Sequence, residues 1–194
     1  MIYLLRHGRL PDSCGGKFIG QADIPLSLEG IEQAKRWAAF FSKQGVKFDH
    51  VLSSDLSRCK ETAGIIAPYV QATFLPALRE IALGEWDGVE RREIISMYPD
   101  EWKKRGEDPA YAPPGGESLA FFYSRVAPAL DEIFKLKGTK LIATHAGVIR
   151  CAICRIMDSP LTRLFSLDAE YAGLTTIDES KNPVSLRGFN TKPY

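Results

Sequence analysis

The chain has 194 residues, of which 45% are apolar and 25% are charged, and its formal net charge is +1. This length suits one domain with a substantial core, so we expect residues 1–194 to form a single domain. The balanced charge argues against a surface for nucleic acid or for a membrane, so any cationic site must be a local cluster.

The first half of the chain predicts strands that alternate with helices. Strands are expected over residues 1–5, 49–54 and 72–75, and helices from about residue 26 and over residues 56–69. A loop rich in glycine and proline fills residues 9–26. Ser27 is the expected N-cap of the first helix, although Gly30 stands at its third position, where glutamate is usual.

The second half of the chain continues this alternation. We expect a short helix over residues 89–98, a loop rich in proline and glycine over 108–116, an amphipathic helix over 118–135 and a strand over 140–144. An apolar helix follows that strand. Two final strands are expected over residues 173–178 and 183–189, joined as a hairpin around Lys181-Asn182-Pro183.

Strands that alternate with helices predict an α/β fold with a mainly parallel sheet covered on both faces. Sheets of this kind place their sites at the carboxyl ends of the strands. Polar groups follow predicted strand ends in three segments, which are Arg6-His7-Gly8, Ser53-Ser54 and Thr144-His145. We therefore expect a functional site where these segments meet.

Two of the three histidines occupy equivalent places in the sequence. His7 and His145 each follow a predicted strand, and each is followed closely by glycine, at Gly8 and Gly147. Glycine lets the backbone turn and lets a ligand approach closely, and the helix that begins after His145 favours a bound anion. His50 precedes an apolar strand and lacks the glycine, so we interpret it as a structural residue.

Two further segments supply a cation and a carboxyl group. Arg58 lies in the first turns of the helix after the second strand, where its guanidinium can reach an anion. Glu80 lies in a segment with two glycines and a tryptophan, which predicts a shaped loop, and its carboxyl group could act as an acid. Glu85 and Asp87 are alternatives for that role, and the spacing does not choose among the three.

Two arginines, two histidines and one carboxyl group form a set suited to phosphate chemistry. Arginine binds phosphate through parallel hydrogen bonds, and histidine can attack phosphorus to form a covalent intermediate. A carboxyl group can protonate the departing alcohol. The sequence has neither a carboxylate cluster typical of magnesium sites nor a P-loop motif, so we expect no metal and no cofactor.

The four cysteines are expected to be reduced, because a cytoplasmic protein is expected here. Cys151 and Cys154 form a C-x-x-C motif in the apolar helix, but no second pair lies at zinc-site spacing. We interpret both as small apolar packing residues. The cytoplasmic location is inferred because no stretch approaches the roughly 18 apolar residues of a membrane helix and the N-terminus is unlike a secretory signal.

The order and spacing of six sequence motifs resemble those of the histidine phosphatase superfamily, also called the phosphoglycerate mutase-like family. The matching motifs are Leu5-Arg6-His7-Gly8, residues 20–27, residues 53–63, Glu80 with Gly84-x-Trp86-Asp87-Gly88, residues 114–118, and residues 144–150. They span nearly the whole chain. The resemblance implies a three-layer α/β sandwich around a mostly parallel central sheet, in which one strand is commonly antiparallel.

The resemblance also implies roles for individual residues. His7 would be the phosphorylated nucleophile, and Glu80, rather than Glu85 or Asp87, would be the proton donor. The positive charges of neighbouring arginines should lower the pKa of His7, which must attack with a neutral nitrogen. The residues implied to hold the phosphoryl group or the rest of the substrate are Arg6, Arg58, His145, Gln21 and Ala146.

Within the superfamily, the sequence is most similar to alpha-ribazole phosphatases, which remove a phosphate late in cobalamin assembly. The similarity lies in residues 20–27 and 114–118. The sequence departs from many members after Gly8, where Arg9-Leu10-Pro11 stands in place of an acidic residue followed by Ser or Thr. Arg9 either adds positive charge near the pocket mouth or is solvated, and both interpretations stay open.

The favoured function is hydrolysis of a small phosphorylated metabolite, with no nucleic-acid or membrane partner and with a homodimer left open. The alternatives are a phosphoglycerate mutase-type phosphomutase and a non-catalytic phospholigand-binding module. Mutases usually carry longer insertions between the Glu80 region and the second histidine, and this chain is compact there. Four aromatic residues either line a pocket for an aromatic base or pack in the core; they are Phe18, Trp86, Trp102 and Tyr111.

Overall fold

The computed structural model describes residues 1–180 and 184–193. These residues form a six-stranded sheet with the strand order β3-β2-β4-β1-β5-β6. The strands are β1 (Ile2–Arg6), β2 (His50–Ser53), β3 (Thr73–Phe74), β4 (Lys140–Thr144), β5 (Leu174–Asp178) and β6 (Ser185–Thr191). The first four run parallel to one another, and β5 is antiparallel to both of its neighbours. The expected mostly parallel sheet with one antiparallel strand is confirmed.

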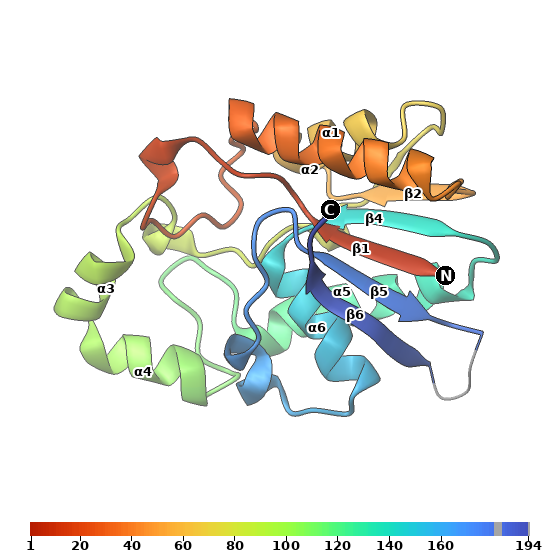
Figure 1. The fold of residues 1–194 in the computed structure, drawn as a ribbon. Helices are drawn as coiled ribbons and strands as arrows, with labels where there is room; N and C mark the ends of the chain where they lie inside the picture. Colours follow the sequence, from red (N-terminus) through yellow and green to blue (C-terminus); the bar gives the residue numbers. More distant parts are fainter. Residues whose placement is uncertain (181–183, 194) are drawn as a thin grey trace.

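Helices cover both faces of this sheet, which confirms the three-layer α/β sandwich (Figure 1). One face carries α1 (Leu28–Lys43) and α2 (Ser57–Ile66), and the other carries α5 (Leu119–Lys135) and α6 (Ala146–Ile156). Successive residues of a strand point to opposite faces, so β1 contributes to two cores. Leu5 packs in the core that contains Trp37 of α1, and Leu4 packs in the core that contains Phe122 of α5.

Two shorter helices, α3 (Arg91–Met97) and α4 (Pro99–Glu107), lie beyond the carboxyl end of β1 instead of on a face of the sheet (Figure 1). One helix was expected over residues 89–98, and α4 was not predicted. Pro99 explains the break, because proline is favoured in the first turn of a new helix and disfavoured inside one. No residue of α4 is buried, so the apolar stripe by which a helix is recognised is absent.

Steric crowding explains why glycine occupies the third position of α1, at Gly30. Ser27 is the N-cap as expected, and its Oγ accepts a hydrogen bond of 3.0 Å from the Gly30 N–H. A Cβ on Gly30 would lie 2.2 Å from the carbonyl oxygen of Arg9, and a Cβ on Gly8 would lie 2.4 Å from the carbonyl oxygen of Gly30. Two glycines therefore let the turn after β1 pack directly against the start of α1.

The two expected C-terminal strands are present as the antiparallel pair β5 and β6. The predicted turn around Lys181-Asn182-Pro183 lies outside the described residues. Cys151 and Cys154 are free thiols buried in the core beneath α6, as expected for packing residues. Among the described residues, no helix is both long enough and apolar enough to cross a membrane.

Candidate active site

The two strand-end histidines meet because β1 and β4 are adjacent parallel strands. Arg6 is paired with Thr144 in the register, and the N–H of His7 donates to the carbonyl oxygen of Thr144 at 2.9 Å. The rings of His7 and His145 are consequently 5.2 Å apart between centroids, and both residues are buried. His50 begins β2 and lies at the opposite end of the sheet.

The hydrogen bonding of His7 fixes which ring nitrogen is available. Nδ1 lies 2.8 Å from the carbonyl oxygen of Gly8, which can only accept a hydrogen bond, so Nδ1 carries the proton. Nε2 therefore keeps a lone pair. Burial, followed by the positive charges of Arg6 and Arg58, holds the pKa of His7 well below its ordinary value. The expected lowering of the His7 pKa by the two arginines is confirmed, and burial lowers this pKa by more than the arginines do.

Two buried guanidinium groups act on His7. Arg58 is 1% exposed and donates from its two Nη atoms to the carbonyl oxygens of Gly20 and Ala22, each at 2.7 Å. Arg6 lies over the ring of Tyr171, 3.8 Å from its centroid. Among the described residues, the Nε atoms of both arginines are buried without a hydrogen-bond partner. A buried unpaired donor is destabilising, so these N–H groups are suited to a bound anion.

His145 lies at the junction of β4, β2 and α2. Its Nε2 is 2.9 Å from Oγ of Ser54, the residue that follows β2, and 3.4 Å from Sγ of Cys59 on α2. Burial, together with the positive charges of Arg58 and Arg6, lowers the pKa of His145 well below its ordinary value. His145 is thus neutral in the unliganded protein, and a bound phosphate dianion would favour its protonated form.

The carboxyl group of Glu80 lies at the N-terminus of α6. Its Oε2 accepts a hydrogen bond of 3.1 Å from the N–H of Gly147, and its Oε1 accepts one of 2.9 Å from the N–H of Ile81. The helix dipole favours negative charge at this position. Glu80 also lines a cavity of about 200 Å³ together with Arg6 and Ala146. The carboxyl group can therefore face a ligand held by the arginines.

The structure separates Glu80 from its two alternatives. Glu85 is exposed and lines a different depression, between α3 and Pro114. Asp87 accepts hydrogen bonds of 2.9 Å from the backbone N–H groups of residues 20–22, which fixes the loop that carries the carbonyl partners of Arg58. Only Glu80 among these three carboxyl groups lines the cavity with Arg6.

Gly147 leaves room for the Glu80 carboxyl group, and its replacement tests the geometry. A Cβ at residue 147 would lie 2.2 Å from Oε1 of Glu80 and 3.0 Å from the ring of Phe122. We expect Gly147→Ala to displace the carboxyl group and to lower turnover of alkyl phosphates by about 100-fold, the scale of a 1 Å misplacement. Gly64→Ala on α2 is the control, because a Cβ there meets nothing within 4 Å. Equal activity of the two variants would contradict this geometry.

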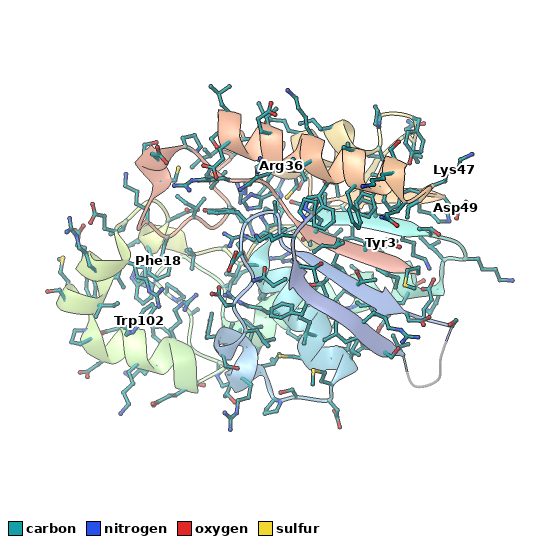
Figure 2. All side chains as sticks on the ribbon, viewed as in Figure 1. Tyr3, Phe18, Arg36, Lys47, Asp49 and Trp102 are labelled. Carbon is teal, nitrogen blue, oxygen red and sulfur yellow. The ribbon has the colours of Figure 1, made fainter. Side chains whose placement is uncertain are left out.

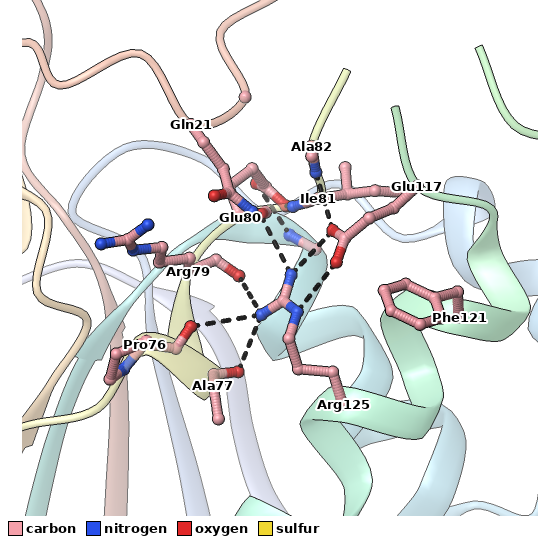
Figure 3. A network of polar contacts seen from close by, with 12 residues as sticks. Gln21, Pro76, Ala77, Arg79, Glu80, Ile81, Ala82, Glu117, Phe121 and Arg125 are labelled. Carbon is pink, nitrogen blue, oxygen red and sulfur yellow. Dashed lines mark hydrogen bonds and ion pairs between the residues drawn. The ribbon is translucent and has the colours of Figure 1, made fainter. Parts of the chain in front are cut away.

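Arg125 of α5 binds the backbone that leads to Glu80 (Figure 3). Its guanidinium donates to the carbonyl oxygens of Ala77 at 3.0 Å, Arg79 at 3.2 Å and Glu80 at 3.3 Å. It also forms two hydrogen bonds with the carboxylate of Glu117, at 2.9 and 2.8 Å. That carboxylate accepts the N–H of residue 82 at 2.8 Å, so one ion pair fixes a segment that lacks regular secondary structure.

Loss of this ion pair is expected to destabilise the fold measurably. We predict that Arg125→Met lowers the free energy of unfolding in urea by about 2–4 kcal/mol, because it leaves the mostly buried Glu117 carboxylate without its cationic partner and removes hydrogen bonds to four backbone carbonyl oxygens. Arg155→Met removes a more exposed pair with Asp131 and should lower it by about 0–1 kcal/mol. The expectation would be wrong if both variants lost the same stability.

The two buried histidines also predict how stability depends on pH. Their folded-state pKa values lie below the ordinary value of about 6.5, so below that pH the unfolded chain binds more protons than the folded protein. The free energy of unfolding should fall between pH 7 and pH 5, by up to about 2 kcal/mol for each histidine. Urea unfolding of the His7→Asn/His145→Asn double variant should show a shallower pH dependence; an unchanged dependence would refute the assignment.

The remaining predicted site residues have mixed placements. Gln21 does not line the cavity; its Nε2 donates to the carbonyl oxygen of Glu80 at 3.1 Å. Ala146 lines the cavity at the start of α6. Arg9 is half exposed, forms ion pairs with Asp12 and Glu29 at 3.2 and 3.4 Å, and lines an open depression together with Arg6 and Tyr171.

Tyr171, Arg105 and Arg150 are among the cavity residues that were not predicted from the sequence. The four aromatic residues divide between the two expected roles. Trp86 is 3% exposed and packs against Tyr111, whereas Phe18 and Trp102 line cavities beside α4, 5.6 Å apart between centroids (Figure 2). Arg150 belongs to the motif at residues 144–150, which is the signal that could have identified it.

Comparison with known proteins agrees with the motif resemblance. Residues 2–192 match the family model described as "Histidine phosphatase superfamily (branch 1)". A curated relative from Serratia proteamaculans (strain 568), named "Probable phosphoglycerate mutase GpmB", is 33% identical over 196 residues. The match covers 97% of this chain and 89% of the relative.

Solved structures with the same fold include two phosphatases. Alpha-ribazole phosphatase from Shigella flexneri superposes with a TM-score of 0.86 at 26% identity, over 98% of this chain and 96% of that chain. A mutant of phosphoserine phosphatase from Entamoeba histolytica, in complex with phosphoserine, also gives a TM-score of 0.86, at 27% identity and with the same coverage. The resemblance inferred from the motifs is therefore confirmed.

Proposed function

This chain belongs to the histidine phosphatase superfamily, and from that premise we propose that it hydrolyses a small-molecule phosphate monoester through a phosphohistidine at His7. The observation that carries the proposal is the environment of His7. Its Nδ1–H donates to the carbonyl oxygen of Gly8, which leaves the lone pair of Nε2 free, and two arginines nearby have buried Nε donors that have no partner among the described residues. A phosphoryl group is the ligand that this arrangement fits best.

In the first half-reaction, the lone pair of His7 Nε2 attacks phosphorus and the bond from phosphorus to the ester oxygen breaks. Arg6, Arg58 and His145 neutralise the charge on the transferring phosphoryl oxygens, the electrostatic effect that dominates phosphoryl transfer. Protonated Glu80 gives its proton to the departing oxygen.

In the second half-reaction, water attacks the phosphohistidine. Ionised Glu80 accepts a proton from the water as the bond from nitrogen to phosphorus breaks, which returns the imidazole to its neutral form and releases phosphate. The guanidinium groups and His145 supply the positive charge in both steps, so the proposed reaction uses no metal ion. The four free cysteines suit a reducing compartment, and we place the reaction in the cytoplasm.

The substrate is proposed at the level of a small phosphorylated metabolite. Alpha-ribazole 5'-phosphate, a cobalamin precursor, is one candidate, supported by the structural similarity to the Shigella flexneri phosphatase. Phosphoserine and 3-phosphoglycerate are others, because relatives from Entamoeba histolytica were crystallised with them. A phosphomutase is the second candidate function, favoured by the name of the relatives that are 33% identical.

The test is phosphate release, with chelator present, from alpha-ribazole 5'-phosphate, phosphoserine, 3-phosphoglycerate and p-nitrophenyl phosphate. The proposal expects chelator-resistant release from at least one substrate. Conversion of 3-phosphoglycerate to 2-phosphoglycerate without net release would favour the mutase instead. No release and no conversion by folded protein, with phosphate ester still bound, would favour a non-catalytic binding module.

A further inference from the structure

A second, larger cavity of about 760 Å³ adjoins the one that contains Glu80. It lies between α4 and the segment at residues 161–168, and it shares Phe18, Arg105, Arg150 and Phe165 with the smaller cavity. A molecule whose phosphate lies beside Arg6 would therefore extend past these four residues into the larger space. The walls of this outer cavity must meet whatever the substrate carries beyond its phosphate.

The shared residues present positive charge that the protein does not neutralise. Among the described residues, Arg105 has neither a hydrogen bond nor an ion pair, and Arg150 donates only to the carbonyl oxygen of Leu167, at 2.7 Å. By contrast, Arg79, Arg125 and Arg155 are each paired with a carboxylate. The outer cavity also contains the carboxyl groups of Glu107 and Asp168, and neither pairs with Arg105 or Arg150.

Arg105 is held in place by aromatic rings instead of by an anion. Its guanidinium carbon lies 4.2 Å from the ring centroid of Phe165, 5.4 Å from that of Phe18 and 5.5 Å from that of Trp102. Partial burial lowers the pKa of Arg105 to about 10, so the group is still a cation at neutral pH. Rings fix the orientation of a guanidinium but leave its N–H donors unpaired.

We propose that the substrate carries a second anionic group, a carboxylate, which binds Arg105 and Arg150 while its phosphate lies at His7. This proposal rests on the proposed phosphatase function. A neutral heterocycle in the outer cavity would displace the water molecules that hydrogen-bond both guanidinium groups. Because it would not replace those hydrogen bonds, the complex would be destabilised. A carboxylate would pair with the planar fork of an arginine. The substrate class is thus a small phosphorylated carboxylic acid.

The experiment compares two phosphate esters that differ only at the far end. In 3-phosphoglycerate a carboxylate stands where glycerol 3-phosphate has a hydroxymethyl group. We expect kcat/KM for the carboxylate to exceed that for glycerol 3-phosphate by at least about 10-fold. Arg105→Met should lower the value for 3-phosphoglycerate by about 10- to 100-fold and the value for glycerol 3-phosphate by less than about threefold.

Lys104→Met is the matched control, because Lys104 is exposed on the same helix and does not line either cavity; it should change neither value. Equal rates for the two esters, equal losses on both in Arg105→Met, or a preference for alpha-ribazole 5'-phosphate would overturn the proposal. Cleavage of p-nitrophenyl phosphate that depends on His7 distinguishes this failure from failure of the proposed function, since it would persist only if the phosphatase chemistry is correct.

Discussion

Replacement of His7 by alanine is expected to lower phosphate release from every accepted substrate by roughly 10⁴- to 10⁶-fold, the scale seen when a catalytic nucleophile is removed. The two neighbouring candidate nucleophiles, His145 and Cys59, are less suited to this role. His145 is buried, and its Nε2 lies within hydrogen-bond distance of Ser54. The burial of Cys59 raises the pKa of its thiol, so it is not a thiolate nucleophile. The measurement is steady-state phosphate release with chelator present.

His50→Ala is the matched control for this variant. His50 begins β2, at the far end of the sheet from the site, and its replacement should leave turnover within about threefold of the parent. Circular dichroism would establish that His7→Ala is folded. Retention of more than about one per cent of parent activity by folded His7→Ala would show that another residue forms the covalent bond or that water attacks phosphorus directly.

The second large effect concerns Glu80 and depends on the leaving group. Glu80→Gln is expected to lower turnover of an alkyl phosphate by about 10²- to 10⁴-fold, because an alkoxide departs poorly without a proton. Turnover of p-nitrophenyl phosphate should fall by less than about 10-fold, since p-nitrophenolate is a stable anion. The substitution keeps the shape of the side chain, but its amide can accept only one of the two backbone N–H groups that the carboxylate accepts.

Glu85→Gln provides the control in the same segment, because this carboxyl group is exposed and lines a different depression. Both substrates should be turned over at near the parent rate by that variant. If Glu80→Gln reduced alkyl and aryl phosphate turnover equally, Glu80 would have a positioning or charge role, and the proton donor would have to be sought elsewhere.

The centre of the site could be predicted because it is built from strand ends. A parallel register that pairs Arg6 with Thr144 necessarily places the next residues, His7 and His145, side by side. The pattern of strand, histidine and glycine is visible in the sequence without knowledge of the register. The position of Arg58 could be predicted for a similar reason. The first turn of a helix that follows a parallel strand lies at the carboxyl-end edge of the sheet, where the two histidines also lie.

The periphery of the site could not be predicted in the same way. Arg105 lies on α4, a helix without buried residues, so no periodic apolar pattern marked the helix or the side that faces the cavity. Tyr171 lies in an irregular segment just before β5 and reaches Arg6 only through tertiary packing. Arg125 is one polar residue on an amphipathic helix, and its role depends on carbonyl groups about 45 residues earlier in the chain.

The spacing could not choose between Glu80, Glu85 and Asp87, because all three lie within eight residues of one another in a loop. The structure favours Glu80 because of the contacts that fix this loop. Arg125 and Glu117 hold the backbone around Glu80, and the N-terminus of α6 binds its carboxyl group. The carboxylate of Asp87 instead accepts three backbone N–H groups, which occupies its oxygens with a structural role.

The most direct test of the account is to trap the phosphorylated enzyme and locate the phosphate. The parent would be mixed with p-nitrophenyl phosphate, quenched in base to preserve the phosphoramidate, and analysed by ³¹P NMR and by peptide mass spectrometry. We predict one phosphate per chain on Nε2 of His7, absent from His7→Ala. Phosphate on any other residue, or turnover without a phosphorylated intermediate under conditions that slow its hydrolysis, would contradict the proposed mechanism.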